Sequence, residues 1–184
     1  MVRDNLDHLP DWPFPEGFGM RLIQPGEEAV WIDIQQDAEP YFDIADDLFD
    51  REFGYDPQAA WERVFLVTDP GGNAVGTMGA WYNRTFRGEN YGRIHWVSTR
   101  QAFQGLGLAK ASLAGALRVL ARHHPKAYLS TQTKRLPAIA IYLDAGFLPY
   151  ITTETDRAAW AQTAPHMRNP EHFDRITTML EASS

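Results

Sequence analysis

The sequence contains no cysteine among its 184 residues, and it contains no long apolar run. The missing cysteine excludes a disulfide, a thiolate metal cage and a cysteine nucleophile, so a covalent acyl-enzyme would need another group. No apolar stretch approaches the roughly 18 residues that a membrane-spanning helix needs. The opening residues 1–7 lack the basic-then-apolar layout of a secretory signal peptide. From these absences we expect a cytoplasmic protein that has no membrane partner.

Three common enzyme signatures are also missing. We find no Walker phosphate loop, no His-Glu-x-x-His zinc-protease motif and no Gly-x-Ser-x-Gly nucleophile elbow. These absences leave P-loop nucleotide hydrolysis, zinc proteolysis and α/β-hydrolase chemistry without support, and we expect no metal. The length suits one domain, and a hydrophobic content of 44% is enough to build its core.

Charge is distributed unevenly along the chain, whose formal net charge is -7. Residues 90–143 include no acid, and their basic residues are Arg93, Arg100, Lys110, Arg118, Arg122, Lys126, Lys134 and Arg135. This stretch predicts an anion-binding region. Residues 27–62 hold half of the 24 acids, which either form a solvated face or attract a cationic ligand. The acidic isoelectric point, near 5.3, argues against a nucleic-acid partner.

The order of elements is predicted from hydrophobic periodicity and from turn residues. Residues 1–17, rich in proline and aromatic side chains, favour an extended arm on the surface. A single domain then covers 18–184, with a core at 20–152 and a helical tail at 153–184. The predicted strands are 20–23, 63–68, 74–82, 91–99, 127–132 and 147–152. The predicted helices are 27–36, 41–53, 108–122, 137–144, 156–162 and 171–181.

A glycine-containing loop lies between a predicted strand and a predicted helix. Gly105 and Gly107 let the backbone approach a ligand closely, and the free N–H groups that begin the following helix would face an anion. A phosphate bound there would also be attracted by Arg100 and Lys110. A dinucleotide site is disfavoured, because the third glycine of the Rossmann fingerprint would fall at Lys110 and no ribose-binding acid follows. The loop therefore predicts a phosphate site of another kind.

The loop resembles motif A of the GNAT superfamily of N-acetyltransferases, whose pattern is Gln/Arg-x-x-Gly-x-Gly/Ala. Gln104, Gly107 and Ala109 match that pattern in order. Residues 138–147 are similar to motif B, in which an alanine, a tyrosine and a terminal Gly-Phe recur at this spacing. The resemblance covers roughly residues 20–152. It implies an α/β fold with a mixed, mostly antiparallel central sheet that is splayed at its fourth strand and flanked by helices.

The resemblance also implies that acetyl-CoA is the co-substrate. Backbone groups of the fourth strand would bind its pantetheine arm, at Val97, Ser98 and Thr99. The loop would hold its pyrophosphate, with the residues Gln104, Gly105, Leu106, Gly107, Leu108, Ala109 and Lys110. Motif B often has asparagine seven positions before its tyrosine, where this chain has Arg135. That arginine either binds a cofactor phosphate or is solvated.

Two residues are candidates for acid and base catalysis. Tyr142, the tyrosine of motif B, is our candidate general acid, because an unperturbed pKa near 10 keeps it protonated beside a leaving thiolate of pKa about 8.5. His95 is our candidate general base for deprotonating an ammonium acceptor. It stands where many members of the resembling family have a catalytic glutamate, although it could instead be a structural histidine. The other candidate bases are Asp33, Glu62 and Glu89.

The sequence therefore predicts an acetyl-CoA-dependent N-acetyltransferase that acts on a primary amine of a small molecule or peptide. Direct attack within a ternary complex is favoured because no cysteine can carry the acyl group. The alternative is a non-catalytic acyl-CoA-binding sensor or interaction module of the same fold. The sequence leaves open whether the protein is a monomer or a homodimer. A cationic acceptor is favoured by the acids of the expected acceptor side, including Asp43, Asp46, Asp47, Asp50 and Glu52.

Overall fold

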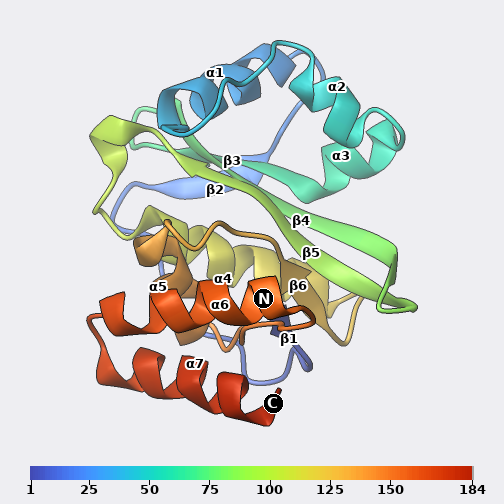
Figure 1. The fold of residues 1–184 in the computed structure, drawn as a ribbon. Coiled ribbons are helices and arrows are strands. Elements are labelled where there is room, and N and C mark those ends of the chain that lie inside the picture. The colour runs from blue at the N-terminus through green and yellow to red at the C-terminus, as the bar shows by residue number, and fades with distance from the viewer. Residues whose placement is uncertain (184) are drawn as a thin grey trace.

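The computed structural model describes residues 1–183 and contains a six-stranded sheet with helices on both faces (Figure 1). The strands lie in the order β1-β6-β5-β4-β3-β2. Neighbouring strands are antiparallel except for β5 and β6, which are parallel. This mixed, mostly antiparallel sheet confirms the predicted fold class.

The strands are β1 (Val2–Arg3), β2 (Gly19–Leu22), β3 (Val64–Thr68), β4 (Ala74–Phe86), β5 (Glu89–Thr99) and β6 (Ala127–Leu129). The helices are α1 (Glu28–Ala38), α2 (Leu48–Phe53), α3 (Pro57–Arg63), η1 (Gln101–Phe103), α4 (Leu108–Ala121), α5 (Leu136–Asp144), α6 (Glu154–Thr163), η2 (Ala164–His166) and α7 (Pro170–Ala182).

The helices form a layer on each side of the sheet. Figure 1 shows α1, α2 and α3 over one face, and α4 and α5 on the other, with α6 and α7 outermost. The core under α1 to α3 is aromatic and includes Trp31, Phe53 and Trp81. On the opposite face α4 buries Leu113 and Leu117 completely, as its apolar stripe predicts. Burying one such leucine stabilises the fold by about 1.5–3 kcal/mol.

Strands β5 and β6 separate partway along the sheet. They pair only from Gly92–Ala127 to Ile94–Leu129, although β5 continues to Thr99. Just past that point β5 carries one extra residue relative to β4, and Trp96 has a positive φ of 47°. The bulge is held from the α1 side, because Gln35 Nε2 of α1 donates to Thr77 Oγ1 at 2.7 Å and Thr77 Oγ1 donates to the Trp96 carbonyl at 2.8 Å. Since β5 is the fourth strand counted from residue 20, this separation is the predicted splay.

Two predicted elements differ from the structure. The helix predicted at 41–53 begins only at Leu48, because side chains bind the backbone groups of the preceding segment. The Tyr41 N–H donates to the Glu39 carboxylate at 2.9 Å, and Gln36 Nε2 donates to the Ile44 carbonyl at 3.1 Å. The strand predicted at 147–152 is wrong: only Leu148 forms a bridge, to Val2. Its partner strand β1 has two residues, so a longer ladder cannot form.

Strand β1, helix α3 and the short helices η1 and η2 were not predicted. Strand β1, at the start of the segment expected as an arm, pairs with β6 at the edge of the sheet. Helix α3 begins with an Asp56 cap, whose carboxylate accepts from the Ala59 N–H at 3.2 Å, and with a proline in its first turn.

The tail after residue 152 is helical, as predicted, and it packs on α5. A capping box between Thr153 and Asp156 starts α6. Arg175 of α7 donates to the Leu143 carbonyl at 2.6 Å, and His172 of α7 lies 2.6 Å from the Asp144 carboxylate. Over residues 1–183, no helix has the length and apolar character that crossing a membrane requires.

Candidate active site

The main cleft lies beyond the point where β5 and β6 separate. It is a cavity of about 560 Å³ bounded by the end of β5, the loop before α4, and α5. The predicted cofactor residues on its wall are Val97, Ser98, Thr99, Gln104, Gly105, Gly107, Leu108, Ala109, Lys110 and Arg135. Leu106 is not among its lining residues, and its side chain is 48% exposed. The sequence did not single out Ala38 and Phe103, which complete the wall together with Pro137, Ala138 and Ile141 of α5.

The loop before α4 has the backbone shape that an anion site needs. Gly105 and Gly107 have φ values of 81° and 83°, in the left-handed region that glycine tolerates. A Cβ built on either residue would meet no atom within 4 Å, so the space beside the backbone is open. Gly107 is the N-cap of the 14-residue helix α4, whose first N–H groups have no intrahelical acceptor. The loop can therefore bind a phosphate through backbone donors and the helix dipole.

The basic side chains around this cleft are already paired with acids. Lys110 Nζ lies 2.8 Å from Asp144, and Arg100 lies 2.6 Å from Asp33. Arg135, for which phosphate binding and solvation were both open, instead lies 2.5 Å from Glu39 of the α1–α2 connection. A phosphate in this cleft would compete with Asp144, Asp33 and Glu39 for the positive charges of Lys110, Arg100 and Arg135. The backbone of the glycine loop is thus the cleft's main source of uncommitted donors.

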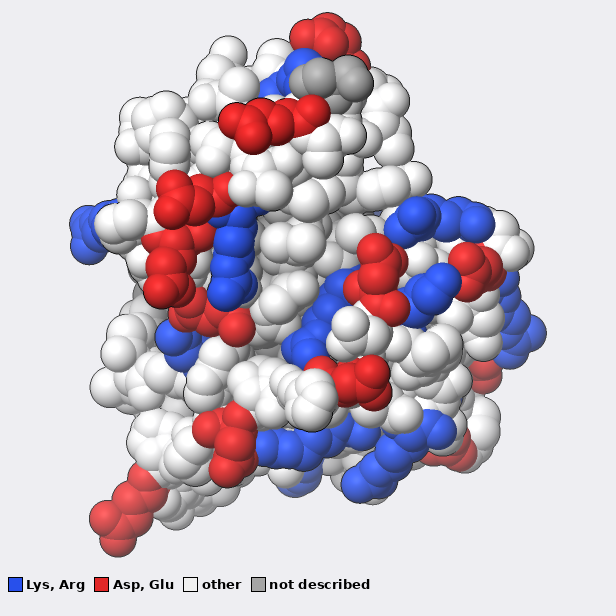
Figure 2. Space-filling view, turned by 90° about the horizontal axis from the view of Figure 1, so that it is seen from below, with Lys and Arg blue, Asp and Glu red and all other residues white. Residues whose placement is uncertain are grey.

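The wider basic stretch does not form one surface. Lys126 lies 2.8 Å from Glu89, and Arg118 lies 2.7 Å from Asp11. Figure 2 shows the same mixing on the face seen from below, where basic and acidic side chains lie beside one another. The folded chain thus brings acids from other segments to residues that are uniformly basic in sequence.

A second cavity, of about 260 Å³, adjoins the main cleft. Both cavities are lined by Val97, Ser98, Arg135 and Tyr142. The smaller one lies toward α1 and is also bounded by Gln35, Glu39, Phe42, Arg93, Ile94, His95, Trp96, Ser130, Thr131 and Gln132. The two cavities therefore form one cleft that passes between the separated strands.

Tyr142 lies where the two cavities meet. It is only 7% exposed, and burial raises the pKa of its hydroxyl to about 12, although Arg135 acts in the opposite direction. Its hydroxyl has no hydrogen-bond partner among residues 1–183. Tyr142 can therefore donate a proton or a hydrogen bond to a group in the cleft throughout the neutral pH range.

His95 lies on β5 at the wall of the smaller cavity, and its ring is held by Glu52 of α2. The distance from His95 Nε2 to Glu52 Oε2 is 2.8 Å. Burial lowers the pKa of His95, and the contact with Glu52 opposes this effect. Hydrogen bonding from His95 lowers the pKa of Glu52 to about 2, so Glu52 is ionised at neutral pH. An ionised carboxylate accepts, so the pairing assigns a proton to Nε2 and leaves the Nδ1 lone pair able to accept a proton.

The three alternative bases lie elsewhere. The Asp33 carboxylate pairs with Arg100, and Glu62 accepts from Gln58 Nε2 at 2.7 Å on the surface of α3. Glu89, at the start of β5, pairs with Lys126. None of these three side chains lines the two cavities of the cleft. Glu52, which the sequence grouped only with the acidic cluster, is the carboxylate next to His95.

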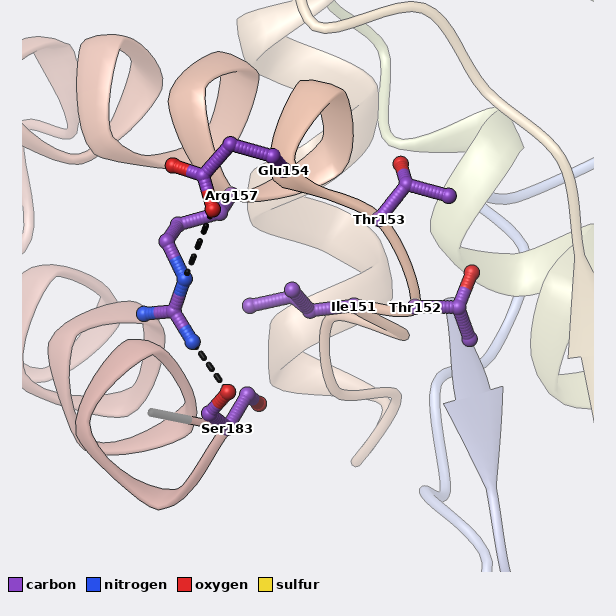
Figure 3. Close-up of a pocket in the computed structure, with 6 residues that line it drawn as sticks. All are labelled: Ile151, Thr152, Thr153, Glu154, Arg157 and Ser183. Carbon is purple, nitrogen blue, oxygen red and sulfur yellow. Dashed lines mark hydrogen bonds and ion pairs between the residues drawn. The ribbon is translucent and has the colours of Figure 1, made fainter.

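A separate depression lies between the start of α6 and the end of α7. Figure 3 shows that Arg157 spans it, reaching Glu154 on one side and the Ser183 carbonyl on the other. Ile151, Thr152 and Thr153 complete its wall. It contains none of the predicted site residues and no glycine loop, so it is not part of the cleft.

Comparison with known proteins gives the class to which this fold and cleft belong. The family model described as "Acetyltransferase (GNAT) family" matches residues 28–147. The chain therefore belongs to the GNAT acetyltransferase family.

The chain is similar to individual proteins in sequence or in structure. The chain is 32% identical to a mycothiol acetyltransferase from Streptomyces bingchenggensis (strain BCW-1) over an alignment of 153 positions, which covers 78% of this chain and 47% of the relative. It thus spans about half the length of the curated relatives that it matches. A GCN5-related N-acetyltransferase from Sphaerobacter thermophilus is similar in structure, with a TM-score of 0.58 and 25% identity. The match covers 79% of this chain and 46% of that protein. The structure of Arabidopsis thaliana Naa50 in complex with the bisubstrate analogue CoA-Ac-MVNAL matches with a TM-score of 0.57 and 19% identity. This match covers 74% of this chain and 85% of Naa50.

Proposed function

We propose that this protein transfers an acetyl group from acetyl-CoA to a primary amine of a small molecule or peptide. The observation that carries this proposal is the continuous cleft through the separated strands, which has a phosphate-binding loop on one side and the His95–Glu52 pair on the other. Tyr142 lies where the two sides meet. The names of the relatives, mycothiol acetyltransferase above all, support the same chemistry.

The residues of the main cavity fit acetyl-CoA. The open space beside Gly105 and Gly107 admits a pyrophosphate against the backbone N–H groups. Backbone groups from Val97 to Thr99, on the part of β5 that has no β6 partner, would bind the pantetheine arm as a neighbouring strand would. When bound, acetyl-CoA supplies an activated thioester carbonyl. Gln104, whose Nε2 donates to the Thr99 carbonyl at 3.1 Å, ties the loop to that strand.

The side chains divide acid and base work. His95 accepts the proton that the ammonium form of the acceptor must lose before its nitrogen can attack. The new C–N bond forms as the C–S bond breaks, and Tyr142 donates its proton to the departing sulfur. The attacking nitrogen loses a second proton as the neutral amide forms, and this proton returns Tyr142 to its protonated state. Both side chains border the smaller cavity, so we place the acceptor amine there.

The acidic side chains near the proposed amine position are Glu39 and Glu52. Asp43, Asp46, Asp47 and Asp50 are exposed and do not line either cavity of the cleft. A cationic acceptor remains our prediction for the amine end of the substrate, because Glu39 lines the smaller cavity and Glu52 contacts His95 on its wall.

The second candidate function is an acyl-CoA-binding sensor or interaction module without turnover. It would use the same glycine loop, but it would need neither the His95–Glu52 pair nor the free Tyr142 hydroxyl. The presence of both groups beside the cleft favours the enzyme.

Binding of acetyl-CoA is the first test of the proposal. A ligand present at about 100 times its Kd stabilises the native state by about 2.7 kcal/mol, which would raise the Tm of a chain of this length by roughly 5–10 °C. Gly107→Val should abolish this rise, because its side chain would stand where the phosphate approaches the backbone. Differential scanning fluorimetry measures both effects. Unchanged protection of the variant would contradict the loop's assigned role.

Gly72→Val is the matched control for this variant. Gly72 lies in the β3–β4 turn with a φ of 82°, and its Cβ would also meet nothing within 4 Å. Both substitutions should lower the Tm of the free protein similarly, because both force a side chain into the left-handed region at about 1–2 kcal/mol. Protection by acetyl-CoA should survive in the control alone.

A further inference from the structure

A third cavity, of about 400 Å³, adjoins the proposed acceptor cavity. It lies at the base of the β4–β5 hairpin, which extends past α3 (Figure 1). Its wall consists of Tyr55, Asp56, Tyr82, Asn83, Arg84 and Arg93. Arg93 is also part of the wall of the 260 Å³ cavity beside His95. An extended molecule could therefore place one end near His95 and the other end in this third cavity.

The two arginines of this cavity differ from those of the cofactor cleft. Arg84 and Arg93 have no carboxylate within ion-pair distance among residues 1–183, whereas Arg100 and Arg135 both do. Each guanidinium lies over an aromatic ring: Arg84 is 5.1 Å from the centre of Tyr82, and Arg93 is 5.8 Å from that of Tyr128. At longer range, Arg84 contributes to lowering the pKa of Asp56, and Arg93 contributes to lowering the pKa of Glu52. The Nε of Arg93 is buried without a hydrogen-bond partner. These guanidinium groups keep donors available for an external anion.

The acids nearest to these arginines are committed to other groups. Asp56 accepts from the Tyr82 hydroxyl at 2.5 Å and from the Ala59 N–H at the start of α3. Glu52 accepts from His95. Asp56 is thus the only acid on the cavity's wall, facing two guanidinium groups. The cavity therefore favours a negatively charged ligand, since an anion would stabilise the partly buried Arg93, whose Nε has no partner, and would also be attracted by the exposed Arg84.

We propose that this third cavity binds an anionic oxygen group, a carboxylate or a phosphate, at the far end of the acceptor whose amine lies beside His95. The acceptor is then an elongated molecule with an amine at one end and an anion at the other. The proposal rests on the proposed function, because it assumes that the amine lies in the 260 Å³ cavity. It adds Arg84 and Arg93 as residues that determine specificity.

The test compares acceptors that differ only in terminal charge and length. Glycine oligomers of one to five residues would be assayed as free acids and as C-terminal amides, and kcat/KM would be measured for each. We expect the free acid to be preferred by about 10-fold at the length that spans the two cavities, from one charge-assisted hydrogen bond. Arg84→Gln should remove this preference while leaving the kcat/KM of the amides unchanged. Aminoalkyl phosphates of similar length distinguish phosphate from carboxylate as the preferred anion.

Two further variants make the outcome specific. Arg122→Gln removes an exposed positive charge from the end of α4, and the preference should survive in this control. Arg93→Lys keeps the charge but loses the geometry of the guanidinium, and it should weaken the preference. The proposal is overturned if no free acid is preferred at any length, or if Arg84→Gln keeps the preference. It is also overturned if Arg84→Gln raises the KM for acetyl-CoA instead.

A failure of the proposed function would look different from a failure of this inference. If no amine releases CoA from acetyl-CoA, the enzymatic proposal fails for every acceptor. Equilibrium binding of the same free-acid and amide peptides, measured by isothermal titration calorimetry, then tests the third cavity alone. Equal binding of both peptides to the wild type would overturn the inference.

Discussion

Tyr142→Phe should lower kcat by about 100-fold or more, while the KM for acetyl-CoA stays nearly unchanged. The hydroxyl can donate in the transition state, and general acid catalysis typically contributes this much. Burial raises the pKa of this hydroxyl to about 12, so it holds its proton at every pH at which the enzyme would work. Steady-state kinetics with saturating acceptor would measure the loss.

Two observations separate a catalytic role of Tyr142 from a structural one. No described residue hydrogen-bonds to its hydroxyl, so Tyr142→Phe should leave the free energy of unfolding unchanged within about 0.5 kcal/mol. Tyr150→Phe, which removes a hydroxyl outside the cleft, is the control and should keep wild-type kinetics. A Tyr142→Phe enzyme with the wild-type kcat would remove this residue from the mechanism.

His95→Gln should lower kcat/KM for the acceptor by about 100-fold and should flatten the acid limb of its pH profile. A general base works only when neutral, and burial holds the pKa of His95 below its ordinary value near 6.5. The wild-type rate should therefore persist below pH 6.5 and fall only as the ring becomes protonated. Initial rates measured from pH 5 to 9 in both enzymes would show the difference.

Glu52→Gln gives an independent check on this base. The Glu52 carboxylate raises the pKa of His95 against the larger effect of burial. Removing its charge should move the acid limb to lower pH, in addition to lowering the rate. An acid limb that is the same in the wild type, Glu52→Gln and His95→Gln would mean that another group is the base.

The proposed cofactor side of the site could be predicted from the sequence because it depends on local backbone. Gly105, Gly107 and the start of α4 are adjacent in the chain, so their left-handed φ values and free N–H groups follow from a short motif. The apolar stripe of α4 likewise predicted the buried face of that helix. Such features need no knowledge of distant contacts.

The proposed acceptor side could not be predicted in the same way because it depends on pairings across the sheet and helices. Glu52 and His95 are joined only when α2 packs beside β5. Arg135 pairs with Glu39 from a different segment, so its role could not be decided from local sequence. The segment before α2 carries a helical pattern, but the side chain of Gln36 donates to the Ile44 carbonyl and that of Glu39 accepts from the Tyr41 N–H, which hold the segment in another conformation. Tertiary contacts outweighed local propensity there.

Initial rates of CoA release, measured while the concentrations of acetyl-CoA and of an amine acceptor are both varied, test the central claim most directly. A panel of amino acids, peptides, polyamines and aminoglycosides supplies the acceptor. The account predicts CoA release only when acceptor is present, an acetylated amine identified by mass spectrometry, and intersecting double-reciprocal lines, because both substrates occupy the cleft together. Parallel lines with an acetylated protein would contradict direct attack. Protection by acetyl-CoA without CoA release for any amine would contradict the enzyme itself and would favour the sensor.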